Sequence, residues 1–208
     1  MLLEMIPCGP VAANMIFVGR DGAKTVAVID PSDAELALAV LKERGWTLSD
    51  ILVTHRHFDH LLGVAGLKKA TGATIYISET DADGLRSNLT SLSMTMRITL
   101  EPVEPDVLLH DGDTFEAAGL SFRVLETPGH TAGGITFVCD DERCAFVGDT
   151  LFRGSCGRCD LEGGDWATMR KTLARLKEII PADAEVYPGH GMPTVMGVEL
   201  QVNPYLAD

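Results

Sequence analysis

Short apolar runs bounded by turn-forming residues recur along this chain, and they predict β-strands. Each run is rich in aliphatic or aromatic side chains, and Gly, Asp or Pro residues stand near its ends, as is typical of buried strands. The predicted strands span residues 15–18, 25–29, 51–53, 74–77, 121–125, 134–138 and 145–147. They fall into two blocks, about 1–77 and 105–147, which we expect to form two sheets.

Apolar positions spaced three and four residues apart mark helices between and after these strands. The clearest pattern predicts a helix over about 166–180, with Asp165 as its N-cap. Weaker patterns predict helices over about 33–44 and just after residue 60. Strand blocks with appended helices predict an α/β fold with four layers, an αββα sandwich in which two sheets pack face to face between outer helices.

Composition adds limits on domains, location and partners. No linker or low-complexity segment interrupts the sequence, which favours one domain over residues 1–208. The formal net charge of −13 disfavours nucleic acid binding, which needs clustered Lys and Arg. No apolar run reaches the roughly 18 residues of a membrane span, and residues 1–7 lack the basic region of a signal peptide. We therefore expect a cytoplasmic protein with no nucleic acid or membrane partner.

The segment 87–105 has a different character, because Ser, Thr and Pro are mixed with apolar side chains that include Met94 and Met96. One interpretation is a mobile loop with a few anchoring side chains. The other is a loop that overhangs a site and adapts to a substrate through its flexible Met side chains. The sequence leaves both open.

The five cysteines are an odd number, which argues against a complete disulfide framework, and reduced thiols are the default in a cytosol. Cys156 and Cys159 form a CxxC pair, and Cys139 and Cys144 lie upstream. A structural four-cysteine zinc site is a less favoured alternative for these residues.

Five of the six histidines lie in short segments that also contain acids, Gly and Pro. His55 and His57 follow a strand end on one side of the chain, and Asp59 and His60 open the next helix. His130 and His190 each follow a Pro-Gly pair, whose Gly allows close approach of the backbone to an ion. Asp149 follows a strand, and its two carboxylate oxygens could bridge two ions. Such a set leaves coordination positions open for water, which is typical of catalytic sites.

The motif HxHxDH at residues 55–60, followed by a His, an Asp and a His, resembles the metallo-β-lactamase superfamily over nearly the whole chain. The resemblance implies two mixed β-sheets within the four-layer sandwich. It also implies that His55, His57 and His130 bind one metal ion, that Asp59, His60 and His190 bind a second, and that Asp149 bridges them. Zinc is the first choice, with iron or manganese possible at such imidazole–carboxylate sites.

Two longer segments resemble the glyoxalase II-like (hydroxyacylglutathione hydrolase-like) branch of that superfamily. They are the sequence GDTLFRGSCGR at 148–158 and TPGHTAGG at 127–134. True zinc β-lactamases generally carry Cys or Ser in place of the bridging Asp. Larger glyoxalase II enzymes have a C-terminal helical region, whereas only 18 residues follow His190 here, so the chain resembles the short, single-domain members.

This branch implies a binuclear metallohydrolase that cleaves a small-molecule thioester such as an S-hydroxyacyl-glutathione. A water between two divalent cations loses a proton near neutral pH, and Asp59 would orient the resulting hydroxide, while a metal stabilises the oxyanion. Arg153 and Arg158 would contact a carboxylate-bearing thiol carrier. Alternatively, Arg158 pairs with Asp160 or Asp165 and only shapes its loop.

Three other functions compete with this one. A mononuclear iron persulfide dioxygenase would use His55, His57 and His130, with or without Asp149. A lactonase or β-lactamase-like hydrolase would use the same two metals on a ring ester or amide. A non-catalytic metal-binding or redox module would use the CxxC pair. Outside the motif residues, we expect Arg56 to point away from the metals, Tyr187 to pack in the core and His110 to lie at the surface.

Overall fold

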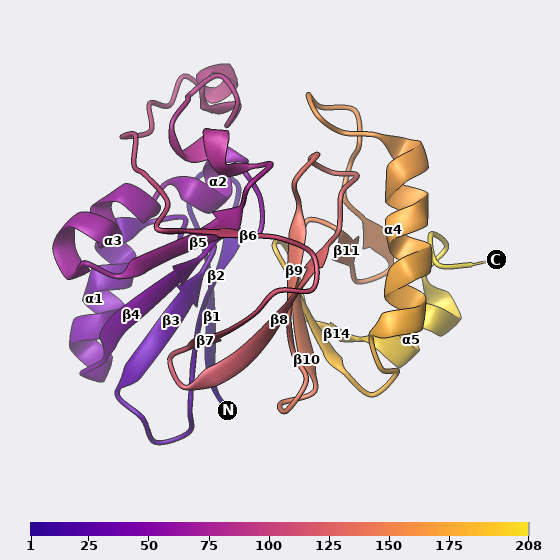
Figure 1. Ribbon diagram of the computed structural model, residues 1–208, viewed down its shortest axis with the longest axis horizontal. Coiled ribbons are helices and arrows are strands. Elements are labelled where there is room, and N and C mark those ends of the chain that lie inside the picture. Colours follow the sequence, from indigo (N-terminus) through magenta and orange to yellow (C-terminus); the bar gives the residue numbers. More distant parts are fainter. Residues whose placement is uncertain (208) are drawn as a thin grey trace.

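The apolar runs become the strands of two mixed sheets that lie face to face, as a computed structural model describing residues 1–207 shows (Figure 1). The first sheet has the order β1 (Leu2–Cys8), β2 (Ala13–Gly19), β3 (Thr25–Ile29), β4 (Thr47–Leu52), β5 (Thr74–Ser78) and β6 (Val107–Leu109). The second has the order β14 (Thr194–Val195), β13 (Glu185–Pro188), β10 (Cys144–Gly148), β9 (Ile135–Cys139), β8 (Leu120–Glu126) and β7 (Thr114–Ala117). A short hairpin of β11 (Leu151–Phe152) and β12 (Ser155–Cys156) follows β10.

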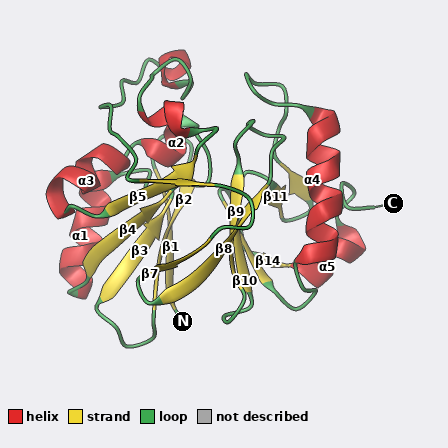
Figure 2. Ribbon diagram, viewed as in Figure 1, coloured by secondary structure: helices red, strands yellow, loops and turns green. Residues whose placement is uncertain are grey.

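Helices cover the outer face of each sheet, which completes the predicted αββα sandwich (Figure 2). The helices on the side of the first sheet are α1 (Ala34–Arg44), α2 (Phe58–Leu61) and α3 (Val64–Thr71). Those on the side of the second are α4 (Trp166–Ile179) and α5 (Met196–Val202). Two 3-10 helices, η1 (Ala82–Leu85) and η2 (Ser93–Met96), lie between β5 and β6.

Both faces of the central strands are apolar because both are covered. On β3, Val26 and Val28 pack in a cluster with α1 and α3, while Ala27 and Ile29 face the cluster between the two sheets. Phe137 and its neighbours from the second sheet complete that inner cluster. A third cluster joins the outer face of the second sheet to α4 and α5. Three layers of buried side chains therefore hold the two sheets to each other and to the outer helices.

All seven predicted strands lie within or overlap observed strands, and the helices predicted over 33–44 and 166–180 are α1 and α4. Asp165 caps α4 as expected, since its Oδ1 accepts a hydrogen bond from the Thr168 amide at 2.7 Å. The prediction that residues 1–77 form one sheet and residues 105–147 the other was wrong at both ends of the second block. β6 belongs to the first sheet, where it pairs with β5. The second sheet extends past residue 147, because β13 pairs with β10 and β14 pairs with β13.

The segment 87–105 is anchored at several points and exposed at others. Its Ser91 carbonyl accepts a hydrogen bond from the Phe58 amide at 2.9 Å, which places it against the start of α2. Leu100 is buried, whereas Leu89 and Met94 are exposed. In residues 1–207, no helix is both long enough and apolar enough to cross a bilayer.

Candidate metal centre

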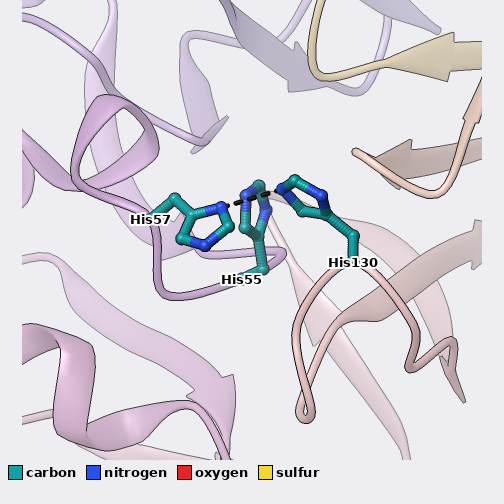
Figure 3. A group of neighbouring side chains, drawn as sticks. All are labelled: His55, His57 and His130. Atoms are coloured by element: carbon teal, nitrogen blue, oxygen red, sulfur yellow. Dashed lines mark hydrogen bonds between the residues drawn. The ribbon is translucent and has the colours of Figure 1, made fainter. Parts of the chain in front are cut away.

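The seven predicted metal-binding residues come together at one edge of the sandwich, from segments far apart in the sequence. Each follows the carboxyl end of a strand: the loop and α2 after β4, the loop after β8, and the turns after β10 and β13. They are His55, His57, Asp59, His60, His130, Asp149 and His190. Figure 3 shows three of them, His55, His57 and His130, converging from the two sheets.

Glycine allows these turns to approach one another. A Cβ at Gly189 would lie only 2.3 Å from Oδ1 of Asp149 and 2.7 Å from Cε1 of His60. Gly148 has a positive φ of 50°, and a Cβ there would collide with the Thr54 side chain. Side chains at either position would separate the loops that carry the candidate ligands.

His55, His57 and His130 form the first group, in which one ring nitrogen from each residue lies within 4.8 Å of the others. His57 Nδ1 is 2.8 Å from His130 Nε2. Burial and then the neighbouring imidazoles lower the pKa of His55 well below its ordinary value. Burial likewise lowers the pKa of His57 to about 3. Both rings are therefore neutral at pH 7, which is the form that binds a metal ion.

Asp59, His60 and His190 form the second group. Asp59 Oδ2 lies 3.4 Å from His60 Nε2 and 3.1 Å from His190 Nε2. Burial opposes charge on both Asp59 and His60, but their mutual attraction outweighs it, so the pKa of Asp59 falls and the pKa of His60 rises. The carboxylate of Asp59 therefore stays ionised over the physiological range.

Asp149 lies between the two groups. Its Oδ2 is 3.5 Å from His130 Nε2 and 3.6 Å from His190 Nε2, and its Oδ1 is 3.6 Å from His60 Nε2. A single carboxylate is thus within reach of nitrogen atoms from both groups. This is the position that a bridging ligand would occupy.

Several buried polar atoms at this edge have no hydrogen-bond partner within the described part of the chain. They are Nε2 of His55, of His57 and of His60, together with Oδ1 of Asp149. A buried unsatisfied polar atom costs about 1–3 kcal/mol. These atoms are imidazole nitrogens and a carboxylate oxygen, which are metal ligands. Divalent cations such as zinc, iron or manganese would therefore satisfy them. The residues present therefore fit a pair of such ions.

Asp30 is a part of this edge that the sequence analysis missed. It lies with His55 and His60 in a further group of ligand atoms. However, both of its carboxylate oxygens are already engaged. Oδ1 accepts from the Thr54 amide at 2.8 Å, and Oδ2 accepts from the Thr54 hydroxyl at 2.6 Å and from His60 Nδ1 at 2.9 Å. Asp30 therefore fixes the proton of His60 on Nδ1 and leaves Nε2 facing the site. The Asp-Pro step directly after a predicted strand was the available signal.

Asn14, at the start of β2, holds the turn that carries His190 and was also missed. Its side-chain amide donates to the carbonyls of Pro188 at 3.0 Å and Gly191 at 2.9 Å. Its backbone amide donates to the Gly189 carbonyl at 2.7 Å. This contact joins residues 174 or more positions apart, and no local sequence pattern reveals it.

The two arginines predicted to contact substrate lie on the segment after β10. The Arg158 guanidinium donates two hydrogen bonds to the Asp160 carboxylate, at 2.6 and 2.7 Å. This is the pairing that the alternative interpretation of Arg158 predicted. The Arg158 carbonyl accepts from His130 Nδ1 at 2.7 Å, which leaves His130 Nε2 facing the site. Arg153 is exposed and has no hydrogen bond or ion pair with residues 1–207.

Other sequence expectations have clear outcomes. Tyr187 packs in the core, stacked on Phe146 with ring centroids 5.3 Å apart, and His110 is an exposed side chain beside Glu79. The Arg56 guanidinium donates a hydrogen bond to the Glu162 carbonyl at 2.8 Å.

The four cysteines do not form one site in the part of the chain that the structure describes. Cys139 and Cys144 face each other across β9 and β10 within the cluster between the sheets. Cys156 and Cys159 instead pack against the cluster under α4. The alternative of a four-cysteine zinc site was therefore wrong, because the two pairs lie in different layers.

Comparisons with known proteins agree with this geometry. The family model of the metallo-beta-lactamase superfamily matches residues 8–190. An uncharacterized protein of Aquifex aeolicus (strain VF5) is 32% identical over 100% of this chain and 98% of its own length. A hydroxyacylglutathione hydrolase of Ectopseudomonas mendocina (strain ymp) is 40% identical over 85% of this chain, but that match covers 61% of its own length. The chain thus spans less than two thirds of that enzyme.

Solved structures show the same architecture. The crystal structure of BLEG-1 B3 metallo-beta-lactamase has a TM-score of 0.93 and 30% identity, and the match covers 100% of both chains. TTHA1623 in a di-iron-bound form has a TM-score of 0.86 and 33% identity, with 98% of this chain and 100% of that chain covered. From the matched family model, the sandwich of two mixed sheets and the His and Asp side chains at its edge, we conclude that this chain belongs to the metallo-beta-lactamase superfamily.

Proposed function

We propose that this protein is a metal-dependent hydrolase with two divalent cations. His55, His57 and His130 would bind one ion, and Asp59, His60 and His190 the other, with Asp149 shared. The observation that carries the proposal is the position of the Asp149 carboxylate, 3.5–3.6 Å from nitrogen atoms of both histidine groups. The unsatisfied buried atoms at the same edge support it.

The proposed chemistry divides between the ions and the chain. A pair of bound divalent cations lowers the pKa of water to near neutrality and polarises a carbonyl. Asp59 holds an ionised carboxylate at the edge of the site, and this carboxylate would orient the attacking water. Asp30 and the Arg158 carbonyl hold protons on Nδ1 of His60 and His130, so these rings keep a fixed orientation.

We propose a thioester as the substrate class, with an S-hydroxyacyl-glutathione as the first candidate. Support comes from the similarity to hydroxyacylglutathione hydrolases and from the GDTLFRGSCGR segment. Arg153 and Arg158 would contact carboxylates of the thiol carrier. Arg153 is the freer of the two, since Arg158 is already neutralised by Asp160. Zinc remains the first choice of metal, and the similarity to TTHA1623 in its di-iron-bound form supports iron as the second.

A ring amide of the β-lactam class is a second candidate substrate. The observation that favours it is the similarity to BLEG-1 B3 metallo-beta-lactamase, which extends over the full length of both chains. Both substrate classes need the same activated water, so the metal centre does not discriminate between them. A panel of a thioester, a lactone and a β-lactam does.

The test combines metal analysis with hydrolysis by wild type and by Asp149→Ala. We expect about two ions per chain in the wild type, hydrolysis of the thioester, and a loss of rate in the variant larger than the 10–100-fold typical for outer-shell residues. His110→Gln is the matched control, because it alters a histidine that lies outside the site. Full activity of Asp149→Ala would reject the bridging role. One iron per chain with oxygen uptake would favour the persulfide dioxygenase instead.

A further inference from the structure

Asp81 lies between the two loops that carry His55, His57 and His130, although it belongs to neither loop. It follows β5 and directly precedes η1, as the N-cap residue of that 3-10 helix. Its side chain is 0% exposed. A buried carboxylate is unfavourable unless donors surround it, so its retention here needs a physical reason.

Three hydrogen bonds surround the Asp81 carboxylate, and they connect the loops. Oδ2 accepts from the Arg56 amide at 3.1 Å and from the Thr131 hydroxyl at 2.6 Å. Oδ1 accepts from the Gly133 amide at 3.0 Å. Arg56 stands between His55 and His57 in the sequence, and Thr131 directly follows His130. One carboxylate therefore ties the loop of the first two histidines to the loop of the third.

Packing and charge around Asp81 are arranged for this contact. A Cβ at Gly133 would lie 2.6 Å from the Asp81 amide nitrogen and 2.8 Å from its Cγ, so only glycine allows the approach. Ser78 reinforces it, since its hydroxyl donates to the Gly133 carbonyl at 2.5 Å and accepts from the Asp81 amide. Burial raises the pKa of Asp81, and the bonds from Thr131 and Arg56 oppose that rise. The Arg56 guanidinium, 3.9 Å away, supplies the compensating charge.

We propose that Asp81 is a positioning residue that sets the separation of His57 from His130, 2.8 Å between ring nitrogens, and so sets the affinity of the three-histidine position for its ion. The inference rests on the ligand assignment of the proposed function, but not on a thioester substrate. Outer-shell contacts of this kind typically change metal affinity by about 10–100-fold.

The informative substitution is Asp81→Asn, which keeps the shape and removes an acceptor. Two of the three donors are backbone amides, of Arg56 and Gly133, and they approach different carboxylate oxygens. An asparagine places its NH₂ group against one of these amides in either orientation. At least one loop therefore loses its backbone hydrogen bond to residue 81, whereas the Thr131 hydroxyl can turn to accept.

The experiment measures stepwise zinc binding to the metal-free full chain by competition with a chromophoric chelator. We expect Asp81→Asn to weaken one of the two binding steps by about 10–100-fold and to leave the other unchanged. The matched control is Asp50→Asn on β4. That buried carboxylate also accepts a backbone amide, from Ala118 at 3.1 Å, but it takes no part in the histidine loops. We expect it to change neither step.

Wild-type affinity in both steps of folded Asp81→Asn would overturn the proposal. An equal loss in both steps would overturn it too, because that result means general loosening. If Asp81→Asn does not fold, Thr131→Val removes only the 2.6 Å hydrogen bond, and the same single step should weaken by a smaller factor. Unchanged zinc binding by Thr131→Val would also overturn the proposal. A split in the zinc steps without thioester hydrolysis would reject the proposed substrate and leave the role of Asp81 intact.

Discussion

Replacing Gly189 by alanine tests whether the convergence of the loops is required for activity. The added Cβ would lie 2.3 Å from Oδ1 of Asp149, and real contacts of this kind are essentially never under 3.0 Å. The difference, 3.0 − 2.3, requires a shift of about 0.7 Å between the turn of His190 and the carboxylate proposed to bridge the ions. A misplacement of about 1 Å costs roughly 100-fold in rate, so we expect kcat to fall by tens of fold to about 100-fold.

The assay compares kcat, metal content and thermal unfolding of Gly189→Ala with those of Gly19→Ala. Gly19 is a matched control, because its Cβ would also come too close to an oxygen, here the backbone carbonyl of Thr25 at 2.8 Å, but at the other end of β2 from Asn14 and the His190 turn. Both variants should lose stability by the roughly 1–3 kcal/mol typical of overpacking. Only Gly189→Ala should lose activity beyond that. Wild-type kcat and two bound ions in folded Gly189→Ala would refute the reasoning.

Three further predictions follow from the same geometry. Asp30→Asn should weaken one zinc-binding step by about 10–100-fold in chelator competition, because His60 Nδ1 loses its carboxylate partner; unchanged binding would contradict the role of Asp30. Arg153→Ala should raise KM for an anionic thioester more than Arg158→Ala does, since Arg158 is paired with Asp160; the reverse order in steady-state kinetics would count against our assignment. Leu173→Ala, at a 1% exposed position on the buried face of α4, should lower the free energy of unfolding by about 2–5 kcal/mol in urea without changing the metal content.

Much of the fold was predictable because hydrophobic periodicity is local information. The runs at 25–29 and 145–147 are apolar on both faces, and they became strands with both faces covered. β6 and β14 could not be placed in this way. They contain only three and two residues, and their sheet membership depends on pairing with β5 and β13. A short strand carries too few side chains to show a pattern, so its partner decides its place.

The sequence by itself determined the chemistry that this edge of the protein offers. Imidazoles and acids that follow strand ends and Pro-Gly turns are local features of the sequence. The candidate metal ligands from His55 to His190 can therefore be identified without a structure. Only the tertiary structure decided how those donors are oriented. Asp30, Asp81 and Asn14 act through contacts with residues far away in the chain. Their hydrogen bonds exist only after the sheets pack, because distance and direction between loops are properties of the folded chain.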